Sequence, residues 1–258
     1  MRTEIKHRKT PEEEELDKKS TELNEFESEL AERELELATL HGELRAFEAR
    51  YLRIVGTHYA ELDDIKAQVA ELQARLTPKD KSSEERATQA RAKAHESAHA
   101  VNIEQEPLTE QGFSPSDNLK RLYREAARSM HPDLAADEEE RSRRGRFMAE
   151  ANQAYERDDE DRLEAILREW EISPESVTGD GGGAELMRVI RKINQVKGRL
   201  SEIEAEINLL KESELYQLRI RVEEAKNQGR DLLTEMVAHL DGQINVAKKK
   251  RGKSKRGK

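Results

Sequence analysis

The sequence predicts an all-α protein in which a small helical domain lies between two long coiled-coil helices. Of the 258 residues, 39% are charged and only 34% are hydrophobic, which is too little apolar content for one large core. Apolar residues recur every three or four positions along two long stretches, which is the spacing of a narrow helical stripe. No apolar run approaches the roughly 20 residues that span a bilayer, and cysteine is absent, so we expect a cytoplasmic protein without disulfides.

The first long stretch covers residues 12–76 and follows a short basic N-terminal segment at 1–11. Its apolar spacing slips by one residue beside Gly56, where we expect a local change in helical winding. A stripe this narrow needs a partner helix to be stable in water. The stripe consists of Leu23, Phe26, Leu30, Leu37, Leu40, Leu44, Phe47 and Tyr51, and then of Val55, Leu62, Ile65, Val69, Leu72 and Leu76.

The second long stretch covers residues 184–246 and has a similar heptad pattern with another slip. The two long helices are predicted to pair either as an antiparallel hairpin within the chain or between chains, and the heptads do not separate these arrangements. The remaining divisions are a linker at 77–113, a helical domain at 114–171, a Gly-rich linker at 172–183 and a basic disordered tail at 247–258.

The most informative stretch of the helical domain is the amphipathic helix that ends at Met130. Ser114 is the expected N-cap, with Pro115 at the first helical position. Pro132 is expected to end the helix, because it lacks an N–H group and disfavours helical geometry at His131. The apolar face comprises Leu119, Leu122, Tyr123, Ala126, Ala127 and Met130, and the opposite face carries Lys120, Arg121, Arg124 and Arg128.

This helix with its His131-Pro132-Asp133 turn resembles helix II and the HPD loop of the DnaJ family of J-domain co-chaperones. The sequence around Asn152, Ala154 and Tyr155 resembles the end of the family's helix III, at the right distance along the chain. A further short helix with Leu163, Ile166, Leu167 and Trp170 on one face is expected to close the core. No stretch resembles the family's helix I, and what occupies its place stays open.

The resemblance implies that the protein binds a DnaK-type chaperone ATPase and stimulates its ATP hydrolysis. Asp133 would accept a charge-assisted hydrogen bond from an arginine of that partner, Pro132 would fix its presentation, and His131 would orient the turn. Lys120, Arg124 and Arg128 would steer the helix onto an acidic patch, and Tyr123 would contribute to the contact surface. Core packing is the alternative role for Tyr123. The resemblance implies no catalytic residue, cofactor or metal in this chain.

Two other motifs have less specific interpretations. The basic run after residue 246 is either an arm that binds nucleic acid or another anionic surface, or a solvated tail, and it contains no aromatic residue to stack on bases. The segment from His95 to His99 matches the HExxH pattern of zinc proteases. Its flanks are polar and small, and the downstream carboxylates are too many to single out a third ligand, so two exposed histidines on a helix are the favoured interpretation.

Two functions from different classes therefore follow from the sequence. The first is a J-domain-type co-chaperone whose coiled-coil arms select a client, determine localisation or mediate self-association. The second is a structural or adaptor coiled-coil protein with a degenerate J-like domain. The intact HPD tripeptide favours the first function, and the missing helix I favours the second.

Overall fold

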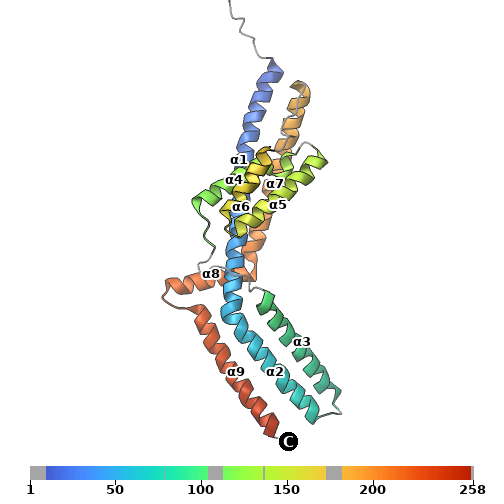
Figure 1. The fold of residues 1–258 in the computed structure, drawn as a ribbon, viewed down its shortest axis with the longest axis vertical. Helices are drawn as coiled ribbons and strands as arrows, with labels where there is room; N and C mark the ends of the chain where they lie inside the picture. Colours follow the sequence, from blue (N-terminus) through green and yellow to red (C-terminus); the bar gives the residue numbers. More distant parts are fainter. Residues whose placement is uncertain (1–9, 79, 104–112, 136, 173–181, 257–258) are drawn as a thin grey trace, which may run out of the picture. The chain divides into compact units, whose positions relative to one another are not determined.

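A computed structural model describes residues 10–78, 80–103, 113–135, 137–172 and 182–256 (Figure 1). Every regular element among these residues is helical, which confirms the all-α prediction. None of the described helices is both long enough and apolar enough to cross a membrane. The chain forms two compact units: the first contains Met1–Glu43 and Phe113–Glu212, and the second contains Leu44–Gly112 and Ser213–Lys258.

The first predicted coiled-coil stretch is a continuous helix with one π-helical turn. Helix α1 (Pro11–Tyr51), the π turn η1 (Leu52–Gly56) and α2 (Thr57–Leu76) follow one another without a break. A π turn holds one more residue than an α turn, so it absorbs a one-residue slip in the apolar stripe. The predicted position of the slip, beside Gly56, is confirmed.

In the first unit, α1 pairs with α7 (Gly182–Glu212), and the two helices run in the same direction (Figure 1). Glu22 binds Lys197 at 3.3 Å and Glu36 binds Lys211 at 3.6 Å, so residue numbers rise together along both helices. The expected antiparallel hairpin is therefore wrong. The physical reason is the long connection between them, which contains several helices and can bring the chain back to the start of α1.

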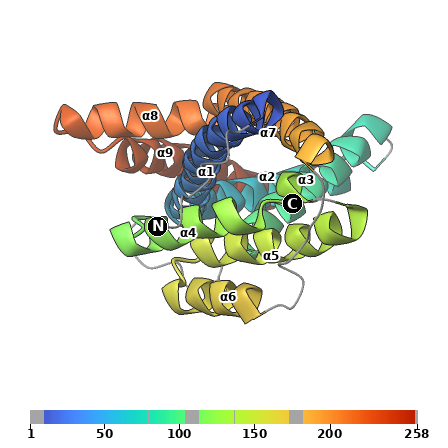
Figure 2. The same ribbon diagram turned by 90° about the horizontal axis from the view of Figure 1, so that it is seen from above.

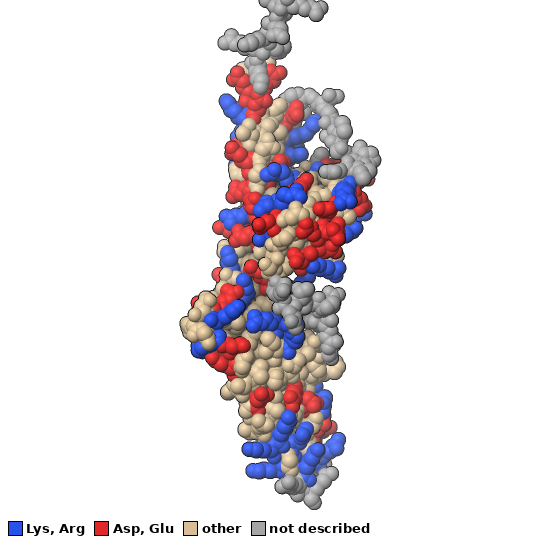
Figure 3. Space-filling view, turned by 60° about the vertical axis from the view of Figure 1, so that its left-hand side comes forward, with Lys and Arg blue, Asp and Glu red and all other residues tan. Residues whose placement is uncertain are grey.

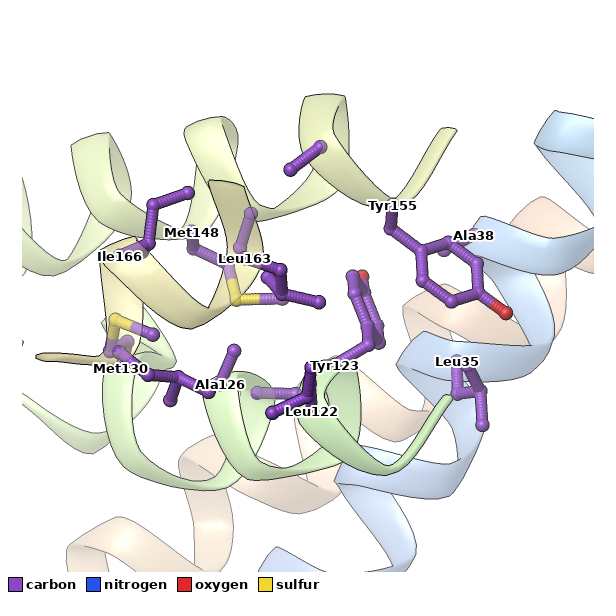
Figure 4. Packing of buried hydrophobic residues seen from close by; sticks show 14 of the residues in the cluster. Leu35, Ala38, Leu122, Tyr123, Ala126, Met130, Met148, Tyr155, Leu163 and Ile166 are labelled. Atoms are coloured by element: carbon purple, nitrogen blue, oxygen red, sulfur yellow. The ribbon is translucent and has the colours of Figure 1, made fainter. Parts of the chain in front are cut away.

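The helical domain predicted at 114–171 is a three-helix module (Figure 2). It consists of α4 (Asp117–Met130), a 3-10 turn η2 (Pro132–Leu134), α5 (Glu138–Glu156) and α6 (Glu160–Ile172). The module does not complete its own core, because Ala31, Leu35 and Ala38 of α1 also pack into it (Figure 4). Helix α1 and helix α6 therefore complete the core of the module together with α4 and α5.

Helix α4 has the predicted buried face, since all six of its expected apolar residues are buried. Its N-cap differs from the prediction: the cap is Ser116 rather than Ser114, and the Ser116 hydroxyl accepts a hydrogen bond from the Leu119 N–H at 2.9 Å. The backbone of Ser116 is extended, so the helix begins at Asp117. Pro132 ends the helix as predicted, because His131 before it is also extended.

Phe113 anchors the start of the module on α1. A Cβ atom added to Gly42 would lie 2.5 Å from the Phe113 ring, so only glycine leaves room for this contact. Phe113 also meets Tyr155 edge to face, with ring centroids 5.6 Å apart. Gly42 therefore permits close packing, and α1 continues through it without interruption.

In the second unit, most of the predicted linker at 77–113 is a helix. Helix α3 (Lys81–Ile103) packs antiparallel to α2, as shown by Arg91, which bonds to Glu71 and Asp64, and by Ser97, which bonds to Asp63. The sequence predicts a linker with some helical content here, and it does not reveal the packing because the packed face of α3 uses alanine, with Ala87 and Ala94 buried. Alanine favours helix and allows close approach, but it produces no large apolar stripe.

The predicted single helix at 184–246 is three helices. Ser213 caps α8 (Glu214–Asn227) through a bond from the Tyr216 N–H, and Gly229 with a φ of 73° turns the chain towards α9 (Leu232–Arg256). These two breaks correspond to local signals that the heptad count overlooked. A second core joins α1, η1, α2, α8 and α9, and it contains Phe47, Val55, Leu62, Ile65, Val222, Leu233, Leu240 and Ile244.

The basic tail is helical through Arg256, so the predicted disorder at 247–258 is wrong for its described part. Two contacts with α2 hold it: Lys248 binds Glu61 at 2.7 Å and Arg251 donates to Gln68 at 2.7 Å. Residues 1–9, the Gly-rich segment at 173–181 and residues 257–258 lie outside the described part, and so do the predictions made for them.

Candidate functional site

The HPD turn is held by hydrogen bonds within the turn itself. The His131 Nδ1 accepts a hydrogen bond from the Asp133 N–H at 3.2 Å, and the His131 carbonyl accepts one from the Leu134 N–H at 3.1 Å. Leu134 is buried and anchors the far end of the turn. Pro132 restricts the backbone between these bonds, so the conformation of the turn is well defined.

His131 is buried against α1 rather than presented on the surface, since only 3% of it is exposed. Its Nε2 lies 2.9 Å from Oε1 of Glu34. Because Nδ1 already accepts a bond, the neutral tautomer with its proton on Nε2 satisfies both contacts. Both ring nitrogens are therefore engaged, and the ring cannot serve as a general base in this arrangement.

Glu34 is a buried carboxylate, 5% exposed, with two donors from different parts of the chain. Its Oε1 also accepts a bond from Nε of Arg199 on α7 at 2.8 Å. Burial raises the pKa of Glu34, but the bonds from His131 and Arg199 outweigh burial and hold the pKa below its usual value. We call Glu34, His131 and Arg199 the buried triad.

Arg199 is itself fixed by acids on α7. It binds Glu206 at 2.8 Å and Glu202 at 3.6 Å in addition to Glu34. Burial lowers the pKa of Arg199, but its bonds to Glu34 and Glu206 raise it above the usual value, so the guanidinium stays charged. Glu34 and Arg199 thus form an ion pair beside a neutral imidazole. Their mutual attraction offsets much of the free-energy cost of burying the two charges.

The basic face of α4 also lies along α1. Arg124 binds Glu32 at 3.0 Å and Arg128 donates to the Ser28 hydroxyl at 2.8 Å. Lys120 is the exception, since it forms an ion pair with Asp117 of its own helix, at 3.9 Å. The structure therefore brings Arg124, Arg128 and His131 together, but on the surface that faces the coiled coil.

Tyr123 is a core residue. It is 1% exposed, its hydroxyl donates to Oδ1 of Asn152 at 2.7 Å, and its ring packs on Tyr155 with centroids 4.6 Å apart (Figure 4). Burial raises the pKa of Tyr123 well above its usual value. This burial favours core packing, the alternative role for Tyr123, and the contact role stays a prediction.

Asp133 differs from the rest of the turn. Its side chain is 27% exposed, and among the described residues the only ion-pair neighbour of its carboxylate is His131, at 3.8 Å. Its backbone carbonyl accepts a bond from Gln195 of α7 at 3.1 Å when the Gln195 amide is oriented to satisfy both its neighbours. The Gln195 side chain of α7 therefore contacts the backbone of the turn, and α7 supplies no cation to the Asp133 carboxylate.

Glu34 and Arg199 were not among the site residues predicted from the sequence. The signal for Glu34 was a gap: the apolar stripe of the first long helix passes from Leu30 directly to Leu37, and Glu34 occupies the skipped core position. A charged residue at such a position requires a buried partner. Arg199 gave no comparable signal, since it stands beside Leu200 in an intact stripe.

The HExxH segment lies on α3. The rings of His95 and His99 are 6.3 Å apart and both residues are exposed. Within the described part of the chain, no group of three or more His, Asp or Glu side chains is arranged to hold a metal ion. The arrangement there agrees with two exposed histidines on a helix.

Comparisons with protein-family models, with curated proteins and with solved structures find no match for this chain.

Proposed function

We propose that the protein is a cytoplasmic co-chaperone of the J-domain type that acts on a DnaK-type ATPase through its HPD turn. The observation that carries this proposal is the unneutralised Asp133 carboxylate. Packing accounts for His131, which bonds to Glu34, but packing gives the Asp133 carboxylate no cation among the described residues. A fixed, half-buried carboxylate without a cation is suited to an arginine of another protein.

The architecture around Asp133 supports the same proposal. Helix α4 ends at the turn and α5 packs beside it, with Tyr123 of α4 bonded to Asn152 of α5. This is the order of elements that the resemblance to J domains requires. The pair of α1 and α7 is then the arm that selects a client or a location.

The proposal is tested by steady-state ATP hydrolysis of the DnaK-type chaperone from the same host. Asp133→Asn keeps the size of the side chain and removes its charge, so we expect stimulation to fall by at least about tenfold, or ~1.4 kcal/mol. Asp161→Asn is the matched control, because Asp161 is an exposed acid on α6 of the same module. Equal stimulation by wild type and Asp133→Asn would reject Asp133 as the contact.

A second candidate, a structural or adaptor coiled-coil protein, is favoured by one observation. Three of the seven residues predicted to contact the chaperone bond to α1 instead, namely Arg124, Arg128 and His131. If the module serves only to brace α1 and α7, no DnaK-type chaperone will respond to the protein or to any variant in which the turn is uncovered.

A further inference from the structure

We propose that the buried triad keeps the HPD turn closed, and that α7 controls this closed state through Arg199. The inference rests on the proposed co-chaperone function, because it assigns a regulation to the same turn. In the closed state the protein stimulates its partner ATPase only weakly. Stimulation rises when α7 leaves α1.

Glu34 lies where the HPD turn and α7 both reach α1. Its Oε1 accepts from the HPD turn, 97 residues away in sequence, and from α7, 165 residues away. The same oxygen atom therefore joins the turn and α7, which also meet directly where Gln195 contacts the Asp133 carbonyl. A change in the position of α7 necessarily changes the surroundings of the atom that holds His131.

Departure of α7 removes Arg199 from Glu34. Glu34 loses the guanidinium that offsets its burial, and water gains access to the carboxylate. Water then competes with the His131 imidazole for Oε1, so the buried position of His131 loses stability. The contact of Gln195 with the Asp133 carbonyl is lost at the same time.

Helix α7 is more easily displaced than the three-helix module. Its buried residues form a single narrow stripe, with Ile193, Val196, Ile203 and Ile207 buried, while Leu209 is 71% exposed. Its ion pairs from Lys197 and Lys211 to α1 are partly exposed, and such pairs contribute about 0–1 kcal/mol each. The three-helix module instead packs around fully buried tyrosines and leucines.

The test uses two variants that weaken the triad, one at its central acid and one at its arginine. Glu34→Gln keeps the shape and removes the charge, and Arg199→Met removes the guanidinium of α7. The matched controls are Asp63→Asn, which alters the other buried acid of the same long helix, and Arg188→Met, which alters an exposed arginine of α7. Circular dichroism and thermal unfolding establish that each variant is folded.

Two quantities are measured on the full chain. One is the rate at which diethyl pyrocarbonate modifies His131, read by peptide mass spectrometry, with exposed His99 as the internal reference. The other is stimulation of the DnaK-type ATPase. We expect both to rise by at least about fivefold in Glu34→Gln and Arg199→Met, the lower end of allosteric couplings, and to be unchanged in both controls.

The outcomes separate the regulation from the function on which it rests. If His131 is modified at wild-type rate in folded Glu34→Gln and Arg199→Met, the triad does not close the turn and the inference is overturned. Strong stimulation by wild type that neither variant increases also overturns it. If His131 becomes reactive but no ATPase responds, the coupling of α7 to the turn stands and the proposed co-chaperone function fails.

A separate observation in the second unit points to an anion-binding surface, and we infer that the end of α9 binds the phosphate backbone of nucleic acid. Lys249, Lys250 and Lys253 are exposed on one side of the helix and have no acidic partner among the described residues. Lys and Arg side chains gather where α9 ends, as Figure 3 shows. The bonds of Lys248 and Arg251 to α2 hold this helix in place.

A nucleic-acid backbone fits this surface better than a membrane. The apolar side of α9, including Leu240 and Ile244, is buried in the second core, so it is not available to insert among lipids. The segment 247–258 has no aromatic residue for base stacking, so contact is limited to phosphates and is independent of sequence.

This surface is tested by fluorescence anisotropy with a labelled single-stranded RNA and by flotation with phosphatidylserine vesicles. Replacing Lys249, Lys250 and Lys253 by Gln should lower the salt slope of RNA affinity by about 2, given ~0.7 per phosphate contact. The control replaces Lys18, Lys93 and Lys226, which are exposed elsewhere. An unchanged slope, or binding to vesicles and not to RNA, would overturn the inference.

Discussion

The two units of the molecule each contain one buried acid on the same long helix, and the two acids have different partners. Asp63 in the second unit accepts a bond from Ser97 at 2.8 Å, across two helices joined by a short turn. Glu34 in the first unit accepts bonds from the HPD turn and from α7, which are distant in sequence. Asp63 joins two helices that follow one another in sequence, whereas Glu34 joins α1 to two elements from elsewhere in the chain.

The largest expected effect is the loss of Glu34. Glu34→Ala leaves Arg199 without its buried partner, so we expect the free energy of unfolding to fall by about 2–3 kcal/mol, somewhat less than for a fully buried pair because water reaches Arg199. The measurement is chemical denaturation followed by circular dichroism.

Asp63→Asn serves as the comparison for Glu34→Ala. It retains an acceptor for Ser97, so we expect a loss of about 1 kcal/mol in the free energy of unfolding and no change at His131. If both substitutions had the same cost, or if Asp63→Asn altered His131, the two acids would not differ in the way described.

The next prediction compares a glycine of α1 with a glycine of α7. Gly42→Ala places a Cβ atom against the Phe113 ring, so the module must shift and we expect a loss of about 1–3 kcal/mol. Gly198→Ala meets nothing within 4 Å in α7 and should stabilise the protein by about 0.5–1 kcal/mol through helix preference. Thermal unfolding of the two variants beside wild type would show the opposite shifts, and shifts of equal sign would contradict this packing.

The smallest predicted effect is a dependence on pH. The folded-state pKa of Glu34 lies below its usual value of 4.5, so its ion pair stabilises the folded state above that pH and the contribution is lost as pH falls through the lower folded pKa. The difference in unfolding free energy between wild type and Glu34→Gln should therefore be constant above about pH 5 and shrink below it. A difference that grew on acidification would contradict the charge assigned to Glu34.

Much of the fold was predictable because it follows from local patterns. The apolar face of α4, its stop at Pro132, the closing helix with Leu163 and Ile166, and the slip beside Gly56 each depend on residues close together in sequence. Periodicity and proline geometry determine such features directly.

The features that were not predictable depend on partners distant in sequence. Stripe spacing is the same for parallel and antiparallel pairs, so the direction of α7 could not be inferred from it. The alanine face of α3 looked like a linker because its packing depends on α2. The covered HPD turn follows from Glu34 and Arg199, whose meeting no local pattern encodes.

His131 is bonded to Glu34 in the resting protein, and nitrogen-15 NMR of the His131 side chain tests this contact. With its Nδ1 accepting from Asp133 and its Nε2 donating to Glu34, His131 should show the single neutral tautomer with the proton on Nε2, unlike exposed His99. Loss of that signal in Glu34→Gln, but not in Asp63→Asn, is the predicted result. A mixture of tautomers at His131 in wild type would show that the turn is not held closed and would contradict the account.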